Sequence, residues 1–361
     1  MTSCRPFMNA RSLIALVLLG ACGPTPIDDP RQDLIVHWGG WLLDHYTDAA
    51  TRADALGVAT TALCAAPDEA RLDAARAAWL AARRPWKEAE VFGFGPYLEE
   101  PIRLGPKADY WPARPESIRA LLASDDPLEP SLLGAQDKGF AAIELMLWDP
   151  TVDPVAALLA EPRRCELLGV IVPDLGAKIR ELREEWSPDG QDFLGELSDA
   201  GSGDTRFMTL QMAFGEVVNH IGFMVETIRN EKLGKAAGVI SGGGPQPKVI
   251  ESPFSGRALD DIRDNLTGVR FLLLGDGADD LGLDGYLRGR GRHLRSLVLE
   301  RLAAVALALD AIDEPLGEAV VDENPKVVAL IARLGELQRT IQVDVLNALS
   351  LSVGFNDNDG D

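Results

Sequence analysis

The stretch ARAAWLAARRPWKEAEVFGFG, residues 75–95, carries the strongest structural signal in this sequence. Two tryptophans and two charged residues recur in it at positions i, i+4, i+7 and i+11, the spacing of one face of an α-helix. They are Trp79, Arg83, Trp86 and Glu90. Tryptophans on one helical face are typical of a buried core, but charged residues there need partners. Two interpretations stay open: an Arg–Glu pair that holds two helices together, and a polar pocket between helical bundles.

The same periodicity recurs along most of the 361 residues, and no succession of β-strands is visible. Helices are expected near 31–65, 68–92, 115–123, 136–148, 162–187, 205–234, 257–274, 288–312 and 324–350. Long helices joined by short loops pack most simply as antiparallel bundles, and this chain length favours two cores. We therefore predict an all-α protein of two packed helical bundles, with a long irregular segment, 93–114, in the first.

Composition shifts divide the chain into four predicted parts. They are a lipoprotein signal peptide (1–21), a tether (22–30), an N-terminal helical bundle (31–200) and a C-terminal helical bundle (201–361). The glycine-rich segment 188–204 is expected to form the hinge between the two bundles.

The N-terminus indicates export. Arg5 and Arg11 precede an apolar run, residues 13–19. This run is too short to span a bilayer as a stable helix. The LGAC sequence that ends at Cys22 resembles the lipobox of bacterial lipoproteins, which implies cleavage before Cys22 and lipidation of its thiol. Gly23 is not the aspartate linked to inner-membrane retention. We expect a lipid-anchored protein of the bacterial envelope that faces the periplasm, at the outer rather than the inner membrane; an ordinary secretory signal is the alternative.

Two further cysteines, Cys64 and Cys165, fall at predicted helix ends. In an oxidising compartment they can pair as a disulfide, and two buried free thiols are the alternative. The formal charge of −21 at pH 7 repels phosphate backbones, so we expect no nucleic-acid partner.

The apolar sequence GFAAIELMLW, residues 139–148, contains an incomplete metal-binding pattern. A Gly-x-His-x-x-Glu pattern on a helix places an imidazole and a carboxylate on one face, and here Gly139 and Glu144 are present while Ala141 occupies the histidine position. Among apolar neighbours, Glu144 either has a buried partner or lines a pocket, and burial without a partner would raise its pKa. Asp109, in the sequence DYWP, either caps a helix or turn or directs its carboxylate into the cleft beside Glu144.

Five segments, taken in this order, resemble the imelysin-like family, bacterial envelope proteins once classed as metallopeptidases. They are 75–90 (ARAAWLAARRPWKEAE), 109–112 (DYWP), 139–144 (GFAAIE), 251–269 (ESPFSGRALDDIRDNLTGV) and 353–361 (VGFNDNDGD). The resemblance covers the chain from about residue 31 onward. It implies two helical bundles with a site at their interface and a link to iron uptake. As cleft residues it implies Trp79, Arg83, Glu90, Asp109, Gly139 and Glu144.

The sequence therefore predicts a binding protein that assists uptake of iron, or of another divalent or trivalent metal, through an interdomain cleft. The expected metal ligands are Glu144, Asp109 and Glu90, and the expected partners are iron-transport components of the envelope. Two alternatives remain: a module that binds a protein or peptide without metal, and a metal-dependent peptidase. Ala141 and Gly93, which stands where the family commonly has an arginine, count against peptidase activity, and no catalytic residue is assigned.

Histidines elsewhere are alternative ligands. His37, Trp41, Asp44 and His45 share one face of the first predicted helix and could replace the missing imidazole, although such residues more often pack or face solvent. His220 follows Glu216 at the i, i+4 spacing of a ligand pair.

Overall fold

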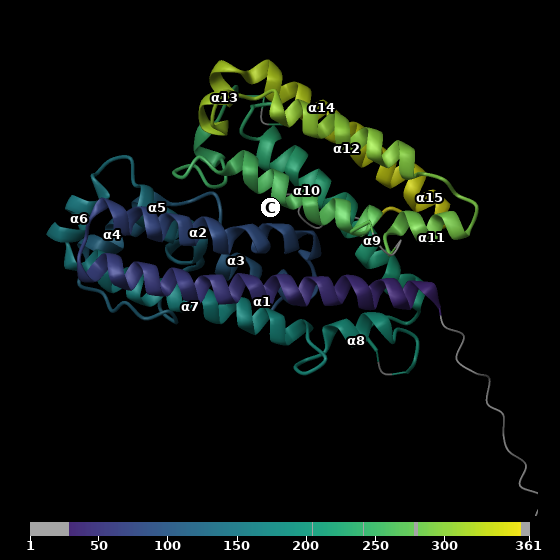
Figure 1. Ribbon diagram of the computed structural model, residues 1–361, viewed down its shortest axis with the longest axis horizontal. Helices are drawn as coiled ribbons and strands as arrows, with labels where there is room; N and C mark the ends of the chain where they lie inside the picture. Colours follow the sequence, from purple (N-terminus) through teal and green to yellow (C-terminus); the bar gives the residue numbers. More distant parts are fainter. Residues whose placement is uncertain (1–28, 204, 241, 278–280, 355–361) are drawn as a thin grey trace, which may run out of the picture.

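A computed structural model describes residues 29–203, 205–240, 242–277 and 281–354. The predicted signal peptide and the lipidation at Cys22 lie outside the described residues. The described part of the chain is helical and contains no β-strand, so the all-α prediction is confirmed. Figure 1 shows the helices in two groups, one built around α1, α2 and α7 and the other around α10, α12 and α14.

The first bundle is built on α1 (Pro30–Ala65), which packs along α2 (Glu69–Ala89) and α7 (Pro162–Trp186). The buried residues of α1 recur every three or four positions, so that one continuous stripe faces the neighbouring helices; they include Leu34, Trp38, Leu42, Tyr46, Ala49, Ala53, Leu56 and Leu63. Asp29 caps α1 by accepting a 3.0 Å hydrogen bond from the backbone N–H of Arg31.

Short elements close the far end of this bundle. They are α3 (Gly105–Ala108), α4 (Pro115–Ala123), α5 (Gly139–Trp148) and α6 (Pro154–Ala160). The predicted irregular segment 93–114 holds only the four-residue α3 and one 3-10 turn, Gly95–Tyr97. Its glycines and prolines prevent a longer helix.

The second bundle contains α9 (Leu210–Thr227), α10 (Ala258–Leu274), α12 (Arg295–Asp310) and α14 (Asn324–Arg339). The π-helical segment η4 (Ile228–Gly234) extends α9. A second π-helical segment, η6 (Thr340–Val345), extends α14 and leads into α15 (Leu346–Ala348). The short helices α11 (Leu283–Gly289) and α13 (Leu316–Asp322) connect the longer ones.

The two bundles meet mainly where α10 packs against α2. Gly268 of α10 permits this approach, because a Cβ atom there would lie 2.2 Å from the carbonyl oxygen of Glu88. The site described below lies beside this contact.

Helix boundaries differ from the prediction at several places. The segment 188–204, expected to be a hinge, contains α8 (Phe193–Ser198), which packs against α1 and α9. Asp192 caps this helix, and the buried Phe193 and Leu194 hold it against the bundle. The helix expected from residue 288 begins at Arg295, because Gly291, with φ of +72°, ends α11 in a left-handed turn.

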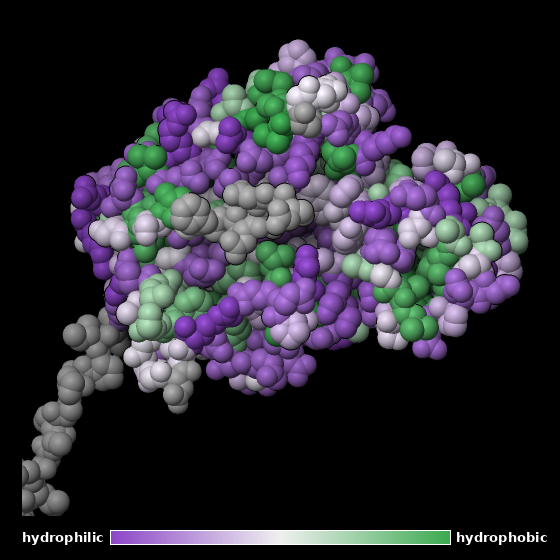
Figure 2. Space-filling view, turned by 180° about the vertical axis from the view of Figure 1, so that it is seen from behind, coloured by the Kyte–Doolittle hydropathy of each residue, from purple (hydrophilic) through white to green (hydrophobic). Residues whose placement is uncertain are grey.

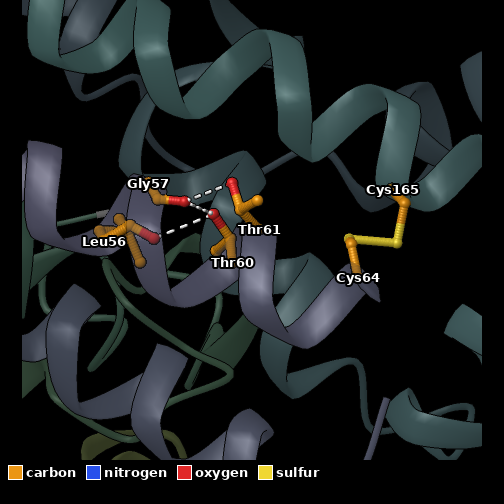
Figure 3. Close-up of a disulfide and its surroundings, with 6 residues drawn as sticks. All are labelled: Leu56, Gly57, Thr60, Thr61, Cys64 and Cys165. Carbon is orange, nitrogen blue, oxygen red and sulfur yellow. Dashed lines mark hydrogen bonds between the residues drawn. A yellow bond between two sulfur atoms is a disulfide. The ribbon is translucent and has the colours of Figure 1, made fainter. Parts of the chain in front are cut away.

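Cys64 and Cys165 form a disulfide that joins the end of α1 to the start of α7 (Figure 3). Their Cα atoms are 5.6 Å apart across a separation of 101 residues. One turn earlier, the hydroxyls of Thr60 and Thr61 donate to α1 carbonyls, at 2.9 Å to Leu56 and 2.7 Å to Gly57.

The surface in Figure 2 is mostly hydrophilic, with separate hydrophobic patches. Among the helices of the described residues, none combines the length and apolar content needed to cross a membrane.

Candidate functional site

Arg83 of α2 lies at the centre of a buried charged network, with 1% of its surface exposed. Its Nη1 is 3.0 Å from Oδ1 of Asp109, and its Nε is 2.8 Å from Oδ2 of Asp261. Its guanidinium carbon also lies 5.2 Å from the ring centre of Trp79 and 5.3 Å from that of Phe140. The guanidinium therefore joins α2, the end of α3, α5 and α10.

Lys87 lies one helical turn after Arg83 and is fully buried. Its Nζ is 2.7 Å from Oδ2 of Asp109 and 3.0 Å from Oε1 of Glu90, and it also contacts Oε1 of Glu251. An ammonium has three donors, and here each faces a different carboxylate.

Glu90 connects this network to the second bundle. Its Oε2 is 2.8 Å from Nζ of Lys232, in η4, and accepts a 2.7 Å hydrogen bond from Nδ2 of Asn265, in α10. The same Lys232 Nζ lies 2.9 Å from Oε2 of Glu251. Polar groups of both bundles therefore satisfy one another at the interface.

Opposite charges face one another in this cluster. Four cationic side chains, Arg83, Lys87, Lys232 and Arg257, face five carboxylates, Asp109, Glu90, Glu251, Asp261 and Asp264. Burial by itself raises the pKa of Asp109, but Arg83 and Lys87 outweigh it and the pKa is lowered. Burial likewise raises the pKa of Glu90, and Lys232 and Lys87 outweigh it and lower that pKa strongly. Both carboxylates are therefore ionised at neutral pH.

Glu144 of α5 is buried beside the network without an ion pair of its own among the described residues. Its Oε1 accepts hydrogen bonds from the backbone N–H of Ser255 (2.8 Å) and from its hydroxyl (2.5 Å). Burial raises the pKa of Glu144 to about 7, against the opposing effect of these hydrogen bonds.

Gly139 and Trp79 fix the position of α5. A Cβ atom on Gly139, where φ is +72°, would lie 2.2 Å from the carbonyl oxygen of Ala108, so only glycine allows α5 to start against the end of α3. The indole N–H of Trp79 donates to the carbonyl oxygen of Phe140 at 3.1 Å. These two contacts bring Asp109, which follows Ala108, close to the Glu144 helix.

Ala141 faces the network, in the position where a motif histidine would stand. It borders a void of about 10 Å³, which is enough for about one water molecule. The void is also lined by Arg83, Asp109, Trp111, Ala113, Glu144, Glu251, Ser252 and Pro253. An imidazole at position 141 would border this void, but the ring is larger than the void, so the lining side chains would have to move to admit it.

A larger cavity of about 360 Å³, which also borders Asp109, lies between the two bundles. The first bundle contributes Glu90, Val91, Gly93, Tyr97, Leu98, Arg103, Pro106, Asp109, Tyr110 and Trp111, and the second contributes His220, Phe223, Met224, Thr227, Glu231 and Lys235. Burial lowers the pKa of His220 to about 4, so its imidazole is neutral at pH 7. Its Nδ1 lies 2.9 Å from the carbonyl oxygen of Glu216, the residue with which the sequence paired it.

The structure brings together all six predicted cleft residues, but in three different roles. Arg83, Glu90 and Asp109 belong to the charged network, Glu144 adjoins it, and Trp79 and Gly139 position the helices. The histidine face of α1 lies elsewhere: Nε2 of His45 is 3.0 Å from Oε2 of Glu88, and the ring of His37 is 5.5 Å from that of Phe271.

The sequence predicted only Arg83, Glu90 and Asp109 of this charged network, and most of its members were missed. Lys87 had a detectable signal, because it follows Arg83 by four residues on the same helical face. Glu251, Ser255, Asp261 and Asn265 all lie within the segment 251–269 that carried the family resemblance, but nothing indicated their partners. Lys232 showed no signal at all.

Three carboxylates in the network, Glu90, Asp109 and Glu251, have oxygen atoms within 4.8 Å of one another. Glu251 is thus the third carboxylate of this group. Glu144, which was predicted as a metal ligand with Glu90 and Asp109, is instead hydrogen-bonded to Ser255. The ammonium of Lys87 already contacts all three carboxylates, and Lys232 contacts two of them. A metal ion would have to displace an ammonium, so the residues as arranged do not fit a metal ion.

The protein is thus an all-α protein of two helical bundles with a buried charged network at their interface. The chain matches the family model described as Imelysin over residues 42–341, and it belongs to that family. It is 28% identical over 344 residues to iron-regulated protein A of Synechococcus elongatus, a match that covers 91% of this chain and 89% of the relative.

Two crystal structures share the fold. One, from Parabacteroides distasonis and described as an iron-regulated protein A precursor, has a TM-score of 0.73 and 18% identity and covers 91% of this chain and 97% of its own. The other, an imelysin-like protein from Psychrobacter arcticum, has a TM-score of 0.70 and 17% identity, with coverage of 90% and 97%.

Proposed function

We propose that this imelysin-family chain is a binding protein of the bacterial envelope that takes part in iron handling, and that its ligand occupies the cavity between the two bundles. The observation that supports this most directly is the position of the 360 Å³ cavity, which borders Glu90 and Asp109 of the charged network. Cavities of this size are typical of small-molecule sites. The link to iron comes from the relative described as iron-regulated protein A.

The ligand that fits the cavity best is a small organic chelate of iron rather than a bare ion. The nearby carboxylates are already neutralised by Lys87, Lys232 and Arg83, so they offer no free negative charge to a cation. Phenol and indole groups of Tyr97, Tyr110 and Trp111 line the cavity, and these groups suit the organic part of a chelate.

Arg103 and Lys235 lie on the cavity wall. Each also pairs with a neighbouring glutamate, Arg103 with Glu100 at 3.2 Å and Lys235 with Glu231. Their remaining N–H donors can bind carboxylate or phenolate oxygens, so an anionic chelate is favoured over a cationic one.

The rest of the proposal concerns location and partners. A lipid on Cys22 would hold the protein at the envelope membrane, at the outer membrane by our expectation, with the domain in the periplasm. Iron-transport components of the envelope would deliver the chelate or receive it. Peptidase activity has little support from the site, because the ionised carboxylates are all paired and Glu144 is bonded to Ser255.

Calorimetry of the full chain tests the proposal. Ferric citrate is the probe, and citrate alone, ferrous, zinc and copper ions are the comparisons. We expect ferric citrate to bind with a Kd below about 1 mM and the bare ions to bind more weakly. Thr227→Trp should fill the cavity and abolish binding, because Thr227 lies on its wall. Thr61→Trp, on the exposed face of α1, is the matched control.

Three results would change the conclusion. No heat from any probe would reject the proposal. Tight binding of a bare ion that Thr227→Trp removes would support direct metal transport instead. Copurification of a protein or peptide whose binding survives a chelator and is lost in Thr227→Trp would support the interaction module.

A further inference from the structure

The end of the molecule at which the described chain begins has exposed arginines and exposed methionines on its surface. Asp29, the first described residue, precedes α1, and Figure 1 shows α11 beside this end of α1. Contacts agree with the picture, because α1 packs against α11 and Nη1 of Arg31 donates to Oε1 of Gln211, in α9, at 2.5 Å.

Arginines are concentrated here, in the segment 288–293 (RGRGRH), which includes the last two residues of α11 and the turn after it. The turn is well defined: the backbone N–H of Arg292 donates to the carbonyl oxygen of Leu287 at 3.0 Å, and that of Gly291 donates to Arg288 at 2.9 Å. With Gly291 at φ of +72°, these two bonds form a Schellman motif. Every residue of the segment is exposed, so the turn presents its cationic side chains to solvent.

The position of Arg290 is fixed by an aromatic contact. Its guanidinium carbon lies 3.7 Å from the ring centre of Tyr286, whose ring is 5.4 Å from that of Phe214 in α9. The pKa of Asp29 is lowered by its hydrogen bond with Arg31 and, more weakly, by the charge of Arg290. The arginine turn therefore lies beside the start of the described chain.

Two acidic residues at this end pair with arginines. Asp29 binds Arg31, and Asp284 lies 2.6 Å from Nη1 of Arg295. Arg290 and Arg292 thus add positive charge beside two carboxylates that other arginines already neutralise, while Asp33, in the first turn of α1, is an exposed carboxylate near the same end. This contrasts with the whole chain, whose formal charge is −21.

Exposed apolar side chains lie at the same end. Met208 is 76% exposed, and Met212 is 48% exposed. Met212 follows Gln211, the residue that contacts Arg31, so these methionines and the arginine turn flank the start of α1. Exposed methionines next to arginines are suited to the boundary between lipid headgroups and acyl chains.

We infer that this end of the molecule binds the surface of an anionic phospholipid membrane through Arg290, Arg292 and His293, with Met208 and Met212 entering the headgroup layer. The chain that precedes Asp29 strengthens the inference. Six residues lie between Cys22 and Asp29, and the seven steps from one to the other span at most about 25 Å in an extended chain. A lipid on Cys22 would therefore hold this end, rather than another, close to the bilayer.

Vesicle flotation of the full chain carrying Cys22→Ser tests the surface without an acyl chain. Vesicles of phosphatidylcholine are compared with vesicles that contain phosphatidylglycerol. We expect preferential binding to the anionic vesicles, which weakens as salt is raised. Arg290→Glu/Arg292→Glu should reduce that preference at least about tenfold, since each arginine near such a surface contributes about fivefold to binding. Met208→Ser/Met212→Ser should weaken binding at high salt as well.

The matched control is Arg52→Glu/Arg114→Glu, which changes the net charge equally; Arg52 pairs with Asp48, and Arg114 stacks on Tyr110 as Arg290 does on Tyr286. This control should leave the preference unchanged. Equal binding of the Cys22→Ser protein to both kinds of vesicle, or an equal loss in both double variants, would overturn the inference. Neither result would bear on ligand binding in the interbundle cavity.

Discussion

The Nζ atom of Lys87 lies 2.7 Å from Oδ2 of Asp109, in the place among three carboxylates where a metal ion would otherwise be expected. The side chain of Lys87 is fully buried, so its ammonium depends on Asp109, Glu90 and Glu251 to compensate for the loss of water. Burial by itself lowers the pKa of Lys87, and the three carboxylates outweigh it and raise that pKa. The protein thus carries its own cation at the bundle interface.

Replacing that cation should be costly. Lys87→Met leaves buried carboxylates without compensation, and we expect the free energy of unfolding at pH 7 to fall by about 3–5 kcal/mol. Lys235→Met, which removes a half-exposed lysine paired with Glu231, should change it by less than about 1 kcal/mol. Denaturant titration measures both. Manganese should partly restore the stability of Lys87→Met alone; equal losses in the two variants would contradict this account.

Restoring the motif histidine should create a metal ligand. Ala141→His places an imidazole three residues before Glu144 on α5 and toward the void that Asp109 also borders. We expect affinity for zinc to rise at least about tenfold, with release of the Glu144 proton near neutral pH. Ala141→Phe, of similar size but without a ligand atom, is the control in calorimetry. Unchanged zinc affinity in Ala141→His would show that Glu144 and Asp109 cannot join an imidazole at this position.

The raised pKa of Glu144 predicts a pH-dependent stability. The folded pKa of about 7 lies above the ordinary value of 4.5, so between these values the folded protein retains a proton that the unfolded chain has released. The free energy of unfolding therefore falls as pH rises through this interval. Relative to Glu144→Gln, the unmodified protein should lose about 2–3 kcal/mol between pH 4.5 and 8. Glu166→Gln, at an exposed position, should show no such difference, and parallel curves for Glu144→Gln would refute the prediction.

Reduction of the disulfide should lower stability without altering the site. Cys64→Ser/Cys165→Ser opens a loop of about 100 residues, and we expect the free energy of unfolding to fall by about 2–4 kcal/mol. A thiol reductant should lower the thermal midpoint of the unmodified protein and leave that of the double variant unchanged. A reductant effect that persisted in the double variant would mean that the bond is not its source.

The left-handed conformation of Gly139 can be tested against a second glycine. Gly139→Ala forces a Cβ atom into the carbonyl oxygen of Ala108, so the free energy of unfolding should fall by about 2 kcal/mol or more. Gly169, on the exposed face of α7, has open space around its Cα atom, and Gly169→Ala should be neutral or stabilising by up to about 1 kcal/mol. Similar effects in both variants would show that the close approach of α3 and α5 does not depend on glycine.

Local sequence patterns predicted the helices because hydrophobic periodicity is a property of neighbouring residues. Trp79, Arg83 and Trp86 do share one face of α2, and Glu90 directly follows its last residue, Ala89. Short helices such as α8 and α11 escaped prediction, since a single turn or two gives too little periodicity and depends on capping and tertiary contacts. The same residues could not show which interpretation of Arg83 was right. Its partners are Asp109, Asp261 and Glu251, and Glu90 pairs with lysines instead.

The sequence alone determined the helical class and the family resemblance. It also determined which side chains share a face within α2 and within α5, because a shared face follows from spacing along a single helix. Only the tertiary structure decided that Lys87 and Lys232 occupy the space between Glu90, Asp109 and Glu251. Lys232 follows Glu90 by 142 residues, and a contact over that separation exists only once the two bundles have packed. When the bundles pack, these charged groups lose their contacts with water and must be compensated by charges of opposite sign. That requirement decides which charged side chains lie together.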